Sequence, residues 1–171
     1  MVAAGGITRT QFDTHFPDKD RLVAEVVVHQ VRRVIDEQAA DIRRLRSLED
    51  LRTWRDRVVA DNRRRHGAHG CPLGSLTIEL AARSEPCRRV LAAGFEAWES
   101  EFRACLRRMR EDGVLAAEAD VGSLAVALMA TLQGGLILAR ITRDSDDLAQ
   151  SLDAALSSIR AHAAMPDATR V

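Results

Sequence analysis

Apolar residues recur at steps of three and four along most of the chain, which is the spacing of one face of an α-helix. The longest such run joins Leu91, Phe95, Trp98, Phe102 and Met109. The sequence has no stretch with the alternating pattern of a half-buried strand, and no Asn-Gly or Asp-Gly turn joins two apolar runs. The pattern therefore predicts an all-α fold.

Start and stop signals divide this pattern into seven expected helices. Serine or aspartate stands at most of the starts, where its side chain can accept hydrogen bonds from free backbone N–H groups. Glycine follows two of the helices, and proline follows two others, since it cannot continue a helix. The expected helices span residues 8–15, 18–45, 47–66, 73–81, 84–113, 120–140 and 145–165.

The segment between Asp120 and Arg140 carries no charge and approaches the length of a membrane span. Glycine, serine, threonine and glutamine interrupt its apolar residues. A helix that is apolar on nearly all sides can instead be buried twice, against its own core and against a partner chain. We interpret the segment in this second way and predict no membrane span.

The 171 residues are enough for one principal domain with a well-buried core. Their formal net charge is zero, so any contact with DNA must be local. The chain has three cysteines, an odd number with no close pairing, and no signal-peptide pattern at its start. These features predict a reduced, cytoplasmic protein.

Candidate chemistry is sparse. The sequence contains no glycine-rich phosphate loop, no His-Glu-x-x-His and no Gly-x-Ser-x-Gly, so we expect no enzymatic activity and no cofactor. His66, His69 and Cys71 could bind zinc or copper, but three such residues in a glycine-rich loop are a weak signature. A solvated loop without a metal is the preferred interpretation.

The start of the chain has a short helix, a turn and a longer helix. Thr8 and Gln11 fit a capping box, and the following His-Phe-Pro-Asp-Lys stretch ends the short helix and begins the next. Together with Gly6 and Ile7, this stretch resembles the recognition helix and hinge of the TetR family of transcriptional regulators. The stretches GCPLGSLTIELA and ATLQGGLILAR are similar to a subgroup of that family.

The resemblance implies a helix-turn-helix reader joined to a helical body. The family has two more helices ahead of the recognition helix, and we expect that Met1 follows the place where they end. Residues 1–20 are then a remnant of the DNA-binding domain, and residues 21–171 form the effector-binding and dimerisation domain. The DNA contacts that the resemblance implies are Thr8, Arg9, Thr10, Gln11, Thr14, His15 and Lys19.

Within this set, Arg9, Thr10 and Gln11 would face base edges, and Arg9 could pair with guanine. Thr14, His15 and Lys19 would hold the phosphate backbone, which sets register. Gln11 has an equally good alternative role in the capping box.

The resemblance also implies that some apolar stripes of the body line a pocket for a small apolar or amphipathic effector. Core packing is the alternative for each of these residues. Gln133 stands alone among apolar neighbours, and a buried amide needs partners, in a ligand or across an interface. The candidate ligand residues are Trp54, Val58, Cys71, Leu76, Phe95, Trp98, Phe102, Met129 and Gln133.

The last two helices are expected to form a four-helix bundle with their copies in a homodimer. The interface residues predicted from their spacing are Leu132, Gly135, Leu136, Leu148, Leu152, Leu156 and Ile159. The resulting hypothesis is a repressor that binds a palindromic operator as a dimer and is released by an effector. The alternative is a dimeric helical sensor or scaffold that does not bind DNA.

Overall fold

The computed structural model describes residues 19–68 and 70–164, except for the side chains of residues 19–21. This part of the chain folds into six helices, which confirms the all-α expectation. They are α2 (Lys19–Ile42), α3 (Leu48–Arg64), α4 (Pro72–Leu80), α5 (Glu85–Glu111), α6 (Val121–Thr142) and α7 (Asp146–Arg160). The helix expected over residues 8–15 lies outside the described residues.

The predicted helix starts are built from side-chain caps. Ser47 and Asp50 form a reciprocal capping box at α3, in which each side chain accepts the other's backbone N–H. The backbone N–H of Arg46 also donates to Asp50, and this bond is the main cause that lowers the pKa of the carboxyl group. At α6, the Asp120 carboxylate accepts the N–H groups of Gly122 and Ser123.

Helix ends differ slightly from the expected ones. We expected α2 to reach Leu45, but it ends at Ile42. There the backbone N–H groups of Arg44 and Leu45 bond to carbonyls three residues back, which tightens the chain into a turn. Gly113 follows α5 with a φ of 73°, a conformation that glycine adopts without strain.

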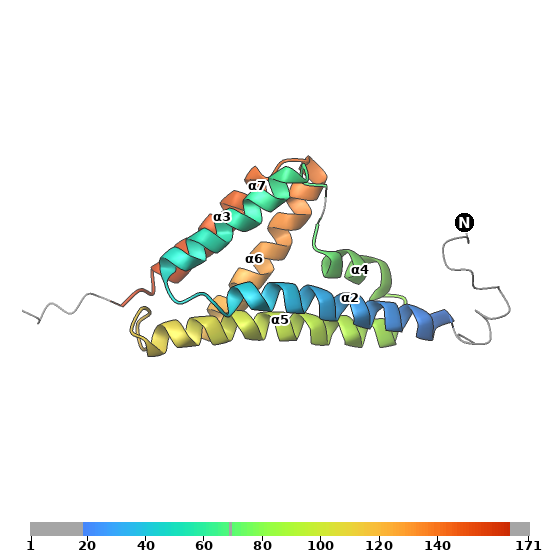
Figure 1. Ribbon diagram of the computed structural model, residues 1–171, viewed down its shortest axis with the longest axis horizontal. Helices are drawn as coiled ribbons and strands as arrows, with labels where there is room; N and C mark the ends of the chain where they lie inside the picture. The colour runs from blue at the N-terminus through green and yellow to red at the C-terminus, as the bar shows by residue number, and fades with distance from the viewer. Residues whose placement is uncertain (1–18, 69, 165–171) are drawn as a thin grey trace, which may run out of the picture.

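The helices form a three-sided arrangement (Figure 1). The long helices α2 and α5 lie side by side along the base, α3 and α7 lie together on a second side, and α6 rises between the two layers. The core fills the space between the layers. There the rings of Trp54 and Phe102 meet edge to face, with centroids 5.3 Å apart.

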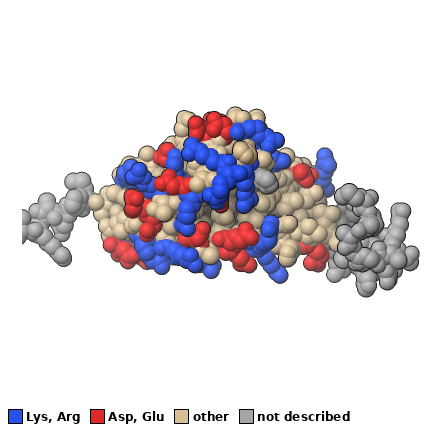
Figure 2. Space-filling view, turned by 45° about the horizontal axis from the view of Figure 1, so that its top comes forward, with Lys and Arg blue, Asp and Glu red and all other residues tan. Residues whose placement is uncertain are grey.

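Helix α6 has two different faces. One face packs in the core through residues such as Leu124, Leu128 and Ala139. The other exposes apolar side chains, and Ile141 is the most exposed at 74%. By length and composition, α6 is apolar enough to cross a membrane, but the core helix of a soluble protein passes the same test. Figure 2 shows acidic and basic side chains interleaved on one face of the molecule.

Candidate ligand-binding site

A cavity of about 380 Å³ lies between the base helices and the α3–α7 layer. Helices α2, α3, α5 and α6 supply most of its lining, together with Gly70, Cys71 and Pro72 at the start of α4. Its volume falls in the range of small-molecule sites, about 300–1,000 Å³. The lining residues are Arg33, Val34, Glu37, Gln38, Val58, Asp61, Asn62, Arg65, Gly70, Cys71, Pro72, Trp98, Leu132 and Leu136.

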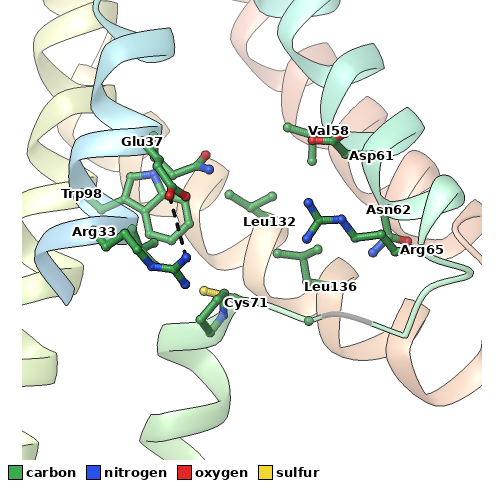
Figure 3. Close-up of a pocket in the computed structure, with 14 residues that line it drawn as sticks. Arg33, Glu37, Val58, Asp61, Asn62, Arg65, Cys71, Trp98, Leu132 and Leu136 are labelled. Atoms are coloured by element: carbon green, nitrogen blue, oxygen red, sulfur yellow. Dashed lines mark ion pairs between the residues drawn. The ribbon is translucent and has the colours of Figure 1, made fainter. Parts of the chain in front are cut away.

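The apolar part of the cavity comes from three helices. Leu132 and Leu136 project from α6, Val58 from α3, and the indole of Trp98 from α5 (Figure 3). Trp98 is 3% exposed, and its Nε1–H has no hydrogen-bond partner among the described residues. A ligand with an apolar body and a hydrogen-bond acceptor would match this lining.

Charged side chains stand on both sides of the cavity. On α2, Arg33 and Glu37 are one helical turn apart and form an ion pair of 4.0 Å (Figure 3). On α3, Asp61 is paired with Arg64. Arg65 takes part in no ion pair within the described part of the chain.

Asn62 is the buried polar residue of the α3 wall, with an exposure of 4%. Its Oδ1 accepts a hydrogen bond of 2.6 Å from the Ser145 hydroxyl, which precedes α7. Its Nδ2 has no partner among the described residues. A buried donor without an acceptor costs free energy, and a ligand oxygen could supply the missing bond.

Cys71 lines both this cavity and a smaller one of about 220 Å³. Burial of its thiol is the main cause that raises the pKa of Cys71. Gln133 lines the smaller cavity, together with Ile78 and Ile137. The Gln133 amide donates to the Met129 sulfur at 3.7 Å, so one of its donors is satisfied within α6.

The candidate ligand residues fall into two groups, those that line a cavity and those that do not. Val58, Cys71 and Trp98 line the larger cavity, and Gln133 lines the smaller one. Trp54, Phe102 and Met129 are buried in the core, and Leu76 and Phe95 are half-buried against it. This second set lines neither cavity, because its side chains fill the space between helices.

The predicted dimer face stays a prediction, and most of its residues are covered within a single chain. Leu132 and Leu136 line the larger cavity, and the other predicted residues are buried inside a single chain. A Cβ added at Gly135 would lie 2.9 Å from Leu148 Cδ1, so α6 and α7 are in close contact there. Five of the predicted residues seal this internal seam within one chain. They are Gly135, Leu148, Leu152, Leu156 and Ile159.

Several other candidates lie outside the described residues. Thr8, Arg9, Thr10, Gln11, Thr14 and His15 are among them, and Lys19 is the first residue of α2, without a described side chain. His69 is also outside, so the His66, His69 and Cys71 metal set is not tested as a whole. Among the described residues, no three His, Cys, Asp or Glu side chains form a group that could hold a metal ion.

Sequence patterns missed Arg33, Glu37, Asn62 and Arg65. The i, i+4 spacing of Arg33 and Glu37 predicts an ion pair on a helix, but not that a cavity lies beside it. Asn62 and Arg65 belong to a polar stretch that is typical of a solvated helix end. Only the packing of α3 against α7 turns this stretch toward a cavity.

Comparison with known proteins agrees with this architecture. Residues 42–155 match the family described as "Tetracyclin repressor-like, C-terminal domain". This match covers well over half of the chain, which therefore belongs to the TetR-like family of transcriptional regulators.

Individual relatives are similar over most of the chain. The HTH-type transcriptional repressor DhaR of Mycobacterium sp. (strain GP1) is 26% identical over 155 residues, 89% of this chain and 76% of DhaR. The HTH-type transcriptional regulator YxaF of Bacillus subtilis (strain 168), named as uncharacterized, is 25% identical over 156 residues, 86% of this chain and 76% of YxaF.

A solved structure shares the fold. The regulatory protein TetR from Rhodobacter sphaeroides superimposes with a TM-score of 0.67, covering 92% of this chain and 82% of its own. Its sequence identity of 22% supports the fold alone.

Proposed function

We propose that this protein is a cytoplasmic transcriptional repressor that binds palindromic operator DNA as a homodimer and is released by a small molecule. Family membership supports regulation of transcription, and DhaR is named a repressor. Residues 1–20 would belong to the DNA-binding part, and residues 21–171 would form the sensing and dimerising part. The proposed function involves neither catalysis nor a cofactor.

The main support for the proposal is the position of helix α2. It begins at Lys19, within the last residues of the proposed DNA-binding part, and four of its residues line the cavity: Arg33, Val34, Glu37 and Gln38. A ligand that contacts α2 in the cavity can therefore favour one position of the segment ahead of it. The expected coupling between the two sites is about 1–3 kcal/mol, the usual range for allosteric proteins.

DNA contacts are proposed for the segment that precedes α2 and for Lys19, the first residue of α2. Arg9, Thr10 and Gln11 would face the bases, and Thr8, Thr14, His15 and Lys19 would hold the backbone. Two copies related by a two-fold axis would then read half-sites one helical turn of DNA apart, roughly 34–36 Å, or a multiple of that distance.

The proposed dimer face is the exposed apolar side of α6. It contains Val126, Ile137, Leu138 and Ile141, each between 44% and 74% exposed in a single chain. Contiguous apolar side chains of this kind are rarely left in water by soluble proteins, and a second copy would cover them. It differs from the face predicted from the sequence, whose residues are mostly covered within a single chain.

The test is fluorescence anisotropy of labelled promoter DNA with this chain and with a version extended upstream of Met1. The experiment uses two salt concentrations, because contacts with phosphates weaken as salt rises. Specific binding by a dimer, lost on addition of a cavity ligand, supports the proposal. Arg9→Ala should then cost about 1–3 kcal/mol of base discrimination.

Other outcomes contradict parts of the proposal. If both versions are dimers and neither binds DNA specifically, the protein is a helical sensor or scaffold rather than a repressor. If DNA binding is specific but the protein is a monomer, the proposed α6 face and the palindromic operator are both wrong.

A further inference from the structure

The α3 side of the larger cavity holds a cation that faces apolar side chains. The Arg65 guanidinium extends from the end of α3 toward Leu132 on α6 (Figure 3). Arginine is the side chain that best matches the planar geometry of a carboxylate, because it can donate two parallel hydrogen bonds. A ligand bound in the cavity would therefore meet the Arg65 guanidinium.

The neighbouring carboxylates do not neutralise Arg65. Glu37 is paired with Arg33 across one turn of α2, and Asp61 is paired with Arg64. Both carboxylates of the lining are paired with other arginines, so Arg65 is the lining arginine without an ion pair among the described residues. A ligand anion would therefore meet one cation without an internal competitor.

A second donor lies on the same wall. Asn62 is one helical turn before Arg65 and is buried, and its Nδ2 has no partner among the described residues. Its Oδ1 is already held by the Ser145 hydroxyl, which fixes the amide so that Nδ2 is the free end. Figure 3 shows the Asn62 amide beside the stem of Arg65. Both side chains offer hydrogen-bond donors on this wall, the guanidinium at the end of an extended stem and the amide beside that stem.

The rest of the cavity is suited to an apolar body. Leu132, Leu136 and Val58 line it between the α3 wall and Trp98. We propose that the effector is an apolar carboxylate, whose carboxylate binds Arg65 and Asn62 and whose body contacts these side chains. This inference rests on the proposed function, because it takes the cavity as the effector site.

The experiment uses biphenyl-4-carboxylate and its neutral, nearly isosteric partner biphenyl-4-carboxamide as probes. Binding is followed at pH 7.5 through the indole N–H resonances of the full chain labelled with ¹⁵N-tryptophan. The chain has two tryptophans, and a spectrum of Trp54→Phe assigns the Trp98 resonance. A shift of that resonance places the probe in this cavity.

Two arginine variants at the same helix end separate recognition from general charge. Arg65→Gln removes the cation that faces the cavity, whereas Arg64→Gln removes an equal charge that is paired with Asp61. Both side chains are exposed, at the surface end of α3, so neither change disturbs the core. Asn62→Asp keeps an oxygen that can accept the Ser145 hydrogen bond, and it replaces the unpartnered Nδ2 donor with a second oxygen.

We expect the carboxylate to bind wild type about tenfold more tightly than the carboxamide, as a charge-assisted bidentate contact would give. Arg65→Gln should reduce this preference to within about twofold, and Arg64→Gln should keep it. Asn62→Asp should weaken binding of the carboxylate probe most, because the new side-chain carboxylate repels it.

Equal affinity for the two probes, or equal losses in Arg65→Gln and Arg64→Gln, would overturn the proposed ligand class and leave the effector cavity itself intact. Absence of any Trp98 shift with either probe would also overturn it. The operator-release experiment is independent of these probes, so it shows separately whether the proposed function fails.

Discussion

The Ser145 hydroxyl and the Asn62 amide are joined by a buried hydrogen bond of 2.6 Å between residues 83 positions apart. This contact ties the start of α7 to the last turn of α3, beside the cavity. Because Ser145 is 3% exposed, water does not readily replace it as the partner of Asn62. The bond therefore contributes to both stability and the shape of the cavity wall.

Ser145→Ala should lower the free energy of unfolding by about 1–3 kcal/mol, because Asn62 Oδ1 loses its donor in a buried place. Urea denaturation followed by circular dichroism measures this. Ser157, exposed on the same helix, is the matched control, and Ser157→Ala should change stability by less than about 0.5 kcal/mol. Equal effects of the two changes would contradict a special role for Ser145.

Gly94 allows α5 to approach α2. A Cβ there would lie 2.7 Å from Val31 Cγ1, and the stiff valine cannot rotate freely away. We expect Gly94→Ala to destabilise the protein, because an overpacking cost of about 1–3 kcal/mol exceeds a helix-propensity gain of about 1 kcal/mol.

Two controls accompany this prediction. Gly134 has nothing within 4 Å of an added Cβ, so Gly134→Ala should not lower the free energy of unfolding. In a Val31→Ala background, Gly94→Ala should lose most of its penalty. If the penalty is unchanged there, the contact with Val31 is not its cause.

Cys105 should make the free energy of unfolding depend on pH in alkaline solution. Burial is the main cause that raises the pKa of its thiol from 9.0 to about 11. The unfolded chain loses this proton first, so the contribution of Cys105 to stability should be constant below about pH 8 and should be lost as the pH rises from 9 to 11. The chain has no tyrosine and a single lysine, Lys19, so few other groups titrate in this range.

Urea denaturation at pH 8 and pH 10.5 checks this prediction. Wild type should lose more stability between the two conditions than Cys105→Ala, whatever the cost of the substitution itself. An identical pH dependence in the two proteins would show that the Cys105 thiol is not the group responsible.

Ile141 tests the proposed dimer face. Ile141→Asp should convert a dimer to a monomer without loss of helix, since the side chain is 74% exposed in a single chain. Light scattering after size-exclusion chromatography measures the mass. Val26→Asp, at a position 52% exposed on α2, is the control and should leave the mass unchanged. A dimer that survives Ile141→Asp would contradict this face.

Much of the fold followed from the sequence by local physics. The capping box of Ser47 and Asp50, the Asp120 cap and the stop at Gly113 act within a few residues, so sequence reveals them directly. The uncharged α6 was predicted to need cover on two sides, and it has one buried and one exposed apolar face. The resemblance to the TetR family rested on motifs of the same local kind.

The assignment of faces and of the cavity depended on tertiary structure. Periodicity marks Trp54, Leu132 and Leu148 equally as apolar positions of helices. In the structure Trp54 packs on Phe102, Leu132 lines the cavity and Leu148 seals the α6–α7 seam. The difference arises because helix tilt and side-chain packing decide which apolar surfaces meet. Asn62 became a candidate binding residue only when α7 brought Ser145 beside it, since no short-range pattern joins residues so far apart in the chain.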